Sequence, residues 1–116
     1  MSESYEYEVV LHSQARADLD DAFQNAARHA PDTACRWVDR FQQALNTLSR
    51  NPQRCPLAPE SRFVDEDSHE FHFGRRPNVF RVFFWIDEPY VRILRIRRAS
   101  RRDLTRRDLE QAIDED

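Results

Sequence analysis

The C-terminal third of this chain is dense in arginine. The stretch VRILRIRRASRRDL, residues 91–104, holds six arginines, and Arg106 and Arg107 follow it. All 18 basic residues of the sequence are arginine, yet the net charge is -3. A guanidinium group is always charged and can pair two oxygens of one phosphate or carboxylate group. The pattern therefore indicates contacts with phosphate groups or with an acidic protein surface.

The charge is distributed unevenly along the sequence. Residues 1–74 carry 7 arginines against 13 acidic residues, residues 75–107 carry 11 against 3, and residues 108–116 carry 5 acidic residues and no base. Such an asymmetry indicates a charged partner more strongly than the net charge does. The alternative is a solvated face in a chain with a general bias toward arginine, which explains the residue type better than the clustering.

One chemistry that suits these residues is cleavage of RNA by its own 2′-hydroxyl without a metal. It needs a general base, cations that stabilise the phosphorane and a general acid. His72 is the best candidate base, because its strand should run beside that of Arg81 and because imidazole titrates near neutrality. Glu70 would share its face. A single histidine on a strand is more often a surface or packing residue, and Arg81 could instead pair with Glu70 or with an acid of the preceding loop.

Histidine, lysine and tyrosine side chains that could transfer a proton are scarce toward the C-terminus. The chain has no lysine, no histidine after His72 and no tyrosine after Tyr90. No general acid can therefore be assigned near the C-terminus, which makes a nuclease the weaker expectation and a binding protein the stronger one.

An α+β fold is expected to position these side chains. Residues 5–11 alternate as a strand does, and residues 13–30 and 31 to about 51 each carry one apolar stripe, as amphipathic helices do. Residues 69–73, 79–86 and 90–97 predict a three-stranded meander, with 79–86 apolar on both faces and therefore central. A short final helix follows a capping box formed by Thr105 and Asp108. The predicted order is β-α-α-β-β-β-α, a helical hairpin packed on a small, mostly antiparallel sheet.

Length and composition set further limits. A chain of 116 residues is expected to form one domain spanning residues 1–116. Cys35 and Cys55 form no CxxC pair or Cys/His cluster, so we expect two free thiols, no metal and no cofactor. No apolar run approaches the roughly 20 residues of a membrane span, and the N-terminus lacks the features of a signal peptide. We therefore expect a cytoplasmic protein that does not enter the membrane.

Several segments in this order resemble the RelE/ParE superfamily of toxins from type II toxin–antitoxin systems, and NPQRCPLAPES around Cys55 is similar to plasmid-stabilisation members. The segments are Tyr7-Glu8-Val9, Ala15 to Leu19, Asn51 to Pro56, Phe73 to Pro77, Phe80 to Phe84, and Ile93 to Arg97 leading to Arg101. The likeness spans nearly the whole chain. It implies the fold predicted above, a cognate antitoxin as partner, and a possible toxin–antitoxin hetero-oligomer.

The resemblance leaves three functions open. ParE-like members inhibit DNA gyrase by binding and do not cleave RNA, and the missing acid and base favour this function. RelE-like members are mRNA interferases that act on the ribosome; Arg81 and Arg101 occupy positions similar to their phosphate-binding arginines, with His72 as the candidate base. The third function is that of an inactive member that only binds its partner. The expected nucleic-acid or antitoxin surface, with Arg81, Arg97 and Arg101 close together, comprises Arg75, Arg76, Arg81, Arg97, Arg98 and Arg101.

Overall fold

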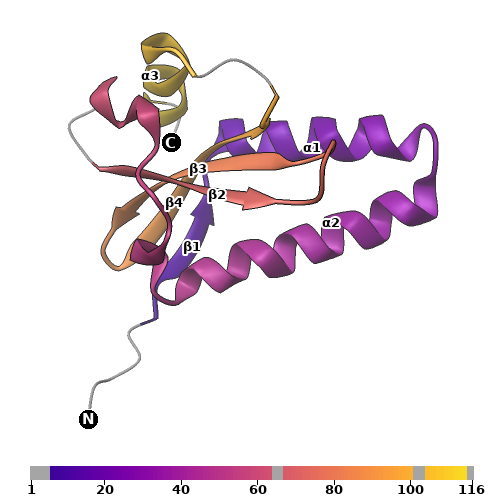
Figure 1. The fold of residues 1–116 in the computed structure, drawn as a ribbon, viewed down its shortest axis with the longest axis horizontal. Helices are drawn as coiled ribbons and strands as arrows, with labels where there is room; N and C mark the ends of the chain where they lie inside the picture. The colour runs from indigo at the N-terminus through magenta and orange to yellow at the C-terminus, as the bar shows by residue number, and fades with distance from the viewer. Residues whose placement is uncertain (1–5, 64–66, 101–103, 115–116) are drawn as a thin grey trace.

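The computed structural model describes residues 6–63, 67–100 and 104–114 (Figure 1). Its elements follow the predicted order. The strands are β1 (Glu8–Leu11), β2 (Ser68–Phe73), β3 (Phe80–Asp87) and β4 (Tyr90–Arg98), and the helices are α1 (Ser13–Ala27), α2 (Pro31–Asn46) and α3 (Arg106–Asp114). The sheet order is β1-β4-β3-β2. Strands β2, β3 and β4 form the predicted antiparallel meander, and β1 joins it parallel to β4. The predicted α+β class is confirmed.

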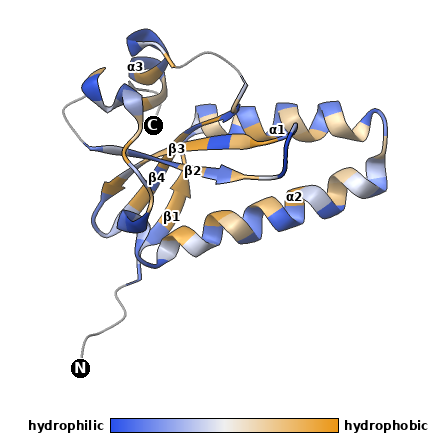
Figure 2. Cartoon of the chain, in the orientation of Figure 1, coloured by the Kyte–Doolittle hydropathy of each residue, from blue (hydrophilic) through white to orange (hydrophobic). Residues whose placement is uncertain are grey.

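Helices α1 and α2 form the predicted hairpin. Pro31 opens α2, where its missing N–H costs nothing. The helix ends at Asn46, before the predicted end near residues 51 and 52, because a 3₁₀ turn over Thr47–Ser49 takes over and brings Leu48 into the core. Figure 2 shows the colour alternating between orange and blue along both helices, as expected for amphipathic segments. In Figure 1 the hairpin extends beyond the ends of the strands.

The larger core lies between this hairpin and one face of the sheet. Its centre is aromatic: the ring centroids of Phe41 and Phe73 are 4.5 Å apart, and Trp37 lies 5.3 Å from both Phe41 and Phe80. Offset and edge-to-face contacts of this kind each add about 0.5–1.5 kcal/mol beyond the burial of apolar area. These aromatic residues therefore form the centre of the larger core.

A smaller core covers the opposite face of the sheet. Phe83 of β3 packs there with Leu104, Leu109 and Ala112 from the C-terminal segment. Strand β3 is therefore buried on both faces, as its sequence predicts. The capping box also forms: the Thr105 N–H donates to Asp108 Oδ2 at 3.0 Å, and the Asp108 N–H donates to Thr105 Oγ1 at 3.1 Å.

Strand β4 contains an irregularity that the sequence does not announce. Phe83 pairs with Arg95 and the next residue, Phe84, pairs with Ile93, so Leu94 is the extra residue of a β-bulge. Ile93 and Ile96 consequently lie in the same larger core although they are three positions apart, while Leu94 lies in the smaller one. The bulge decides which face each arginine of β4 occupies.

Candidate functional site

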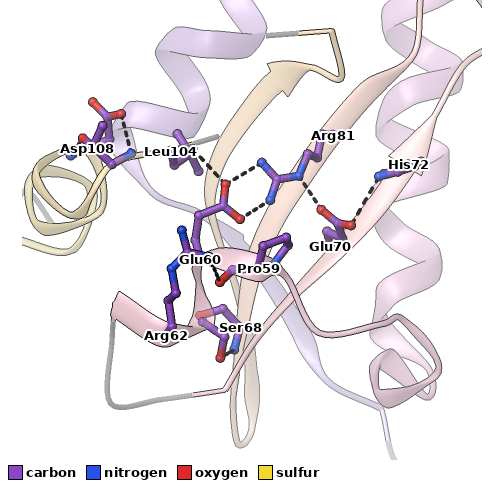
Figure 3. Close-up of polar contacts among 11 residues, drawn as sticks. Pro59, Glu60, Arg62, Ser68, Glu70, His72, Arg81, Leu104 and Asp108 are labelled. Carbon is purple, nitrogen blue, oxygen red and sulfur yellow. Dashed lines mark hydrogen bonds and ion pairs between the residues drawn. The ribbon is translucent and has the colours of Figure 1, made fainter. Parts of the chain in front are cut away.

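The centre of the site is an ion cluster around Arg81, the second residue of β3. Its guanidinium fork donates both Nη1 and Nη2 to Glu60, with Nη1 lying 2.8 Å from Oε2, and its Nε donates to Glu70 (Figure 3). The Arg81 side chain is only 11% exposed. The sequence offered an alternative to a catalytic role, in which Arg81 pairs with Glu70 or with an acid of the loop. In the structure Arg81 pairs with both.

Glu60 comes from the 3₁₀ segment Pro59–Phe63 and has a side chain with no exposed surface. The backbone N–H of Leu104 also donates to its Oε2, at 2.8 Å. Burial alone would raise the pKa of Glu60, but the hydrogen bonds from Arg81 and Leu104 outweigh it and lower that pKa below its ordinary value. Burial acts on Arg81 in the opposite sense and is also outweighed, so the two carboxylates raise its pKa. Both groups are therefore charged at neutral pH.

Glu70 and His72 come from β2, which pairs with β3 so that His72 lies opposite Arg81. Glu70 stands between the other two residues: its Oε2 lies 3.7 Å from His72 Nε2, while its Oε1 accepts from Arg81. The His72 side chain is 54% exposed. The structure thus brings His72, Glu70 and Arg81 together in a row, with the imidazole at the surface and the guanidinium inside.

The other arginines predicted for the binding surface have different partners. Arg97 of β4 lies opposite Arg81 of β3 in the strand register. Its Nη2 is 3.9 Å from Oδ2 of Asp108. Burial would raise the pKa of Asp108, but the hydrogen bonds from Thr105 and the charges of Arg97 and Arg95 lower it. Arg98 donates to Asn78 Oδ1 at 2.9 Å, with its guanidinium carbon 5.4 Å from the ring centroid of Phe80.

The predicted binding surface also includes Arg75, Arg76 and Arg101. Arg75 and Arg76 are exposed in the loop after Gly74. Arg101 lies outside the described residues; of the three arginines expected to lie close together, Arg81 and Arg97 are opposite each other on β3 and β4. Among the residues described, no group of three His, Cys, Asp or Glu side chains is placed to hold a metal ion. Cys35 is an exposed free thiol on α2, and Cys55 is a buried one in the loop.

A groove of about 860 Å³ opens between the outer half of the hairpin and the end of β4. Arg28, Arg40, Arg97 and Arg98 lie along it, together with Asp18. Asp18 is held by Arg95, with Nε 2.7 Å from Oδ2 and Nη2 2.9 Å from Oδ1, so it adds little free negative charge. The apolar lining comprises Ala22, Ala26, Ala30, Ala34, Trp37, Phe80 and Ile96. The groove is therefore a trough with both apolar and polar walls, flanked by guanidinium groups and by the carboxylate of Asp21.

Sequence reasoning missed two acids that determine this arrangement. Glu60 lies in a proline-rich loop without periodicity, and only the need of a buried arginine for a partner pointed to it. Asp18 could be placed on α1 but not against Arg95, because the bulge at Leu94 sets the direction of that side chain. In the part of the chain that the structure describes, no helix is both long and apolar enough to cross a membrane.

The chain is similar to one family model and to two solved structures of toxin–antitoxin systems. The family model for the ParE toxin of the type II toxin–antitoxin system parDE matches residues 9–103. The fold is similar to a structure of the chromosomal ParDE system from P. aeruginosa, with 22% identity, a TM-score of 0.66, and coverage of 82% of this chain and 98% of that chain. A structure of the RelBE2 toxin–antitoxin complex from Mycobacterium tuberculosis is 26% identical, with a TM-score of 0.49 and coverage of 87% and 100%. Among curated proteins, none matches.

Proposed function

The chain belongs to the ParE toxin family of type II toxin–antitoxin systems, and we propose that it arrests growth in the cytoplasm by binding DNA gyrase, without cleaving RNA. The observation that carries this proposal is the state of Arg81. Three of its nitrogens donate to the carboxylates of Glu60 and Glu70, and the side chain is nearly buried. A nuclease would need this guanidinium to face a phosphate group.

The electrostatics of the cluster support a binding protein further. Arg81 brings one positive charge, and Glu60 and Glu70 bring two negative charges, so the cluster repels a phosphodiester more than it attracts one. A polynucleotide would have to displace a carboxylate that has no exposed surface. The energy of that exchange opposes binding of RNA at this position.

A cognate antitoxin is the proposed regulator, and the groove beside the hairpin is the surface that suits it. The trough offers apolar area from Trp37 and Phe80, and Arg28, Arg40 and Arg98 stand along its edges. An amphipathic segment with apolar side chains on one side and Asp or Glu on the other matches both features. Such a segment would form a toxin–antitoxin hetero-oligomer and cover exposed arginines of the toxin.

The alternative is a ribosome-dependent mRNA interferase, and one observation favours it. His72 is exposed and lies 3.7 Å from Glu70, next to the arginine that RelE-like enzymes would use. In that case His72 would act as the base and Arg81 and Arg101 would stabilise the phosphorane, after a rearrangement that frees Arg81 from Glu60. The general acid has no candidate among the described residues.

One antitoxin-free preparation tests both functions. Gyrase supercoiling and cleavage-complex formation are measured beside cleavage of mRNA on programmed ribosomes, with wild-type protein and with His72→Gln. We expect gyrase inhibition by both proteins and no mRNA cuts, because inhibition by binding does not require a general base. Codon-positioned cuts that disappear in His72→Gln would overturn the proposal and establish the interferase. If neither activity appears, the third function, binding of a partner alone, replaces it.

A further inference from the structure

The Glu60 carboxylate lies in a set of donors that proteins also use to bind phosphate. The guanidinium fork of Arg81 offers two parallel N–H groups, and the backbone N–H of Leu104 adds a third donor from another segment. Bidentate arginine and main-chain N–H groups together form the usual surroundings of a bound oxyanion. In this protein the oxyanion belongs to the chain itself.

The two acids of the cluster reach Arg81 in different ways. Glu70 is part of β2, so its position is fixed by the pairing of that strand with β3. Glu60 comes from the short 3₁₀ segment Pro59–Phe63 and enters the site from beyond the sheet (Figure 3). A change at Glu60 therefore removes the ligand from the fork and leaves the strands that position Arg81 in place.

We propose that Glu60 is a specificity-determining residue: its carboxylate occupies a phosphate-binding position on Arg81 and Leu104 and thereby excludes phosphate groups from the site. This inference deepens the proposed function and rests on it, since it assigns the lack of RNA chemistry to one side chain. Shortening Glu60 would leave the two Nη groups of Arg81 and the Leu104 N–H facing an empty volume. An oxyanion of phosphate size would meet the same three donors there.

The test compares Glu60→Ala with Glu60→Gln. The first vacates the position, and the second removes the charge but still fills the volume with an amide. Thermal unfolding of both variants and of the wild type is followed during titration with inorganic phosphate, with chloride adjusted to hold the ionic strength constant. A ligand that binds only the folded protein raises Tm with its concentration, by roughly 10 °C at a hundredfold excess over Kd.

We expect a saturable rise of Tm in Glu60→Ala and none in Glu60→Gln or the wild type. The rise should disappear in the double variant Glu60→Ala/Arg81→Met, which a general salt effect would not do. A fluorescent single-stranded RNA, added in place of inorganic phosphate, separates the two sources of the ligand. RNA binding that depends on Arg81 identifies backbone phosphate, and a response to inorganic phosphate alone identifies a site for small oxyanions.

An equal response of Glu60→Ala and Glu60→Gln to phosphate, or no response in either, overturns the inference. If Glu60→Ala is insoluble, Glu60→Ser is refolded in phosphate and in chloride of equal ionic strength, and equal yields overturn it as well. The titration contains no gyrase. A failed titration beside gyrase inhibition by the wild type therefore rejects only the role of Glu60, and a successful titration without gyrase inhibition rejects only the proposed target.

Discussion

Replacing Arg81 by methionine should destabilise the protein strongly at neutral pH. The substitution keeps much of the side-chain volume but removes the one cation between Glu60 and Glu70, whose side chains are 0% and 18% exposed. Removing one partner of a buried ion pair costs about 3–5 kcal/mol, because the other charge stays buried without compensation. For a domain of this size that loss lowers Tm by roughly 12–20 °C.

The difference in stability between Arg81→Met and the wild type should also depend on pH. In the wild type the pKa of Glu60 is lowered, so its stabilising contribution is present above the unfolded-state pKa and is lost as pH falls through the folded-state pKa. In Arg81→Met the hydrogen bond from the Leu104 N–H still lowers the pKa of Glu60, but burial and the charge of Glu70 raise that pKa and Arg81 no longer offsets them. The variant therefore gains stability from this group as pH falls, and the gap between the two proteins should narrow between pH 7 and about pH 4.5.

The assay is urea unfolding of Arg81→Met, Arg92→Met and wild type at both pH values. Arg92→Met is the matched control, because Arg92 pairs with Asp87 on the neighbouring strand with side chains 31% and 57% exposed. Such a pair contributes about 0–1 kcal/mol. A loss in Arg81→Met no larger than that of Arg92→Met, or a gap that stays constant with pH, would refute the reasoning about the buried cluster.

Two further predictions concern the hairpin, the loop and the C-terminal helix. Ellman's reagent should label Cys35 in the folded protein and Cys55 only after unfolding, because Cys55 is buried and burial raises the pKa of its thiol against the smaller opposing charge of Arg54; labelling of both at equal rates would contradict the loop geometry. Thr105→Ala should cost about 1 kcal/mol in urea unfolding through loss of the α3 cap, whereas Thr33→Ala, at an exposed position of α2, should change stability by less than about 0.5 kcal/mol.

The elements of the fold were predictable where side-chain periodicity has a single physical cause. Strand β3 is apolar at every position except Arg81 and Asp87, and only a strand covered on both faces accommodates that pattern. Pro31 marked the start of α2, and the pair Thr105 and Asp108 marked the start of α3, because both features depend on neighbours within one turn. Local chemistry of this kind is visible in the sequence.

The site was predictable only in part, because long-range register decides it. The sequence placed His72 beside Arg81 from strand pairing alone, and the structure has them opposite each other. It could not place Glu60, whose loop has no period, nor the faces of Arg95 and Arg97, which depend on the extra residue at Leu94. A bulge adds a single residue to the ladder and leaves no compositional mark, so strict alternation gives the wrong face beyond it.

The arginines of the basic segment that the structure describes differ in their surroundings. Arg81, Arg95 and Arg97 of the sheet each lie against carboxylates that belong to other elements: Glu60 and Glu70, Asp18, and Asp108. Three arginines of the basic segment are thus paired with acidic residues that come from the segments flanking it in sequence.

Another set of arginines differs in its surroundings. Arg28, Arg40 and Arg98 are exposed around the groove, and in the described part of the chain none of them has a carboxylate within ion-pair distance. These three offer positive charge to a partner on the hairpin side of the molecule, away from the cluster of Arg81. Substituting them should therefore weaken antitoxin binding and its salt dependence without the loss of stability expected for Arg81→Met.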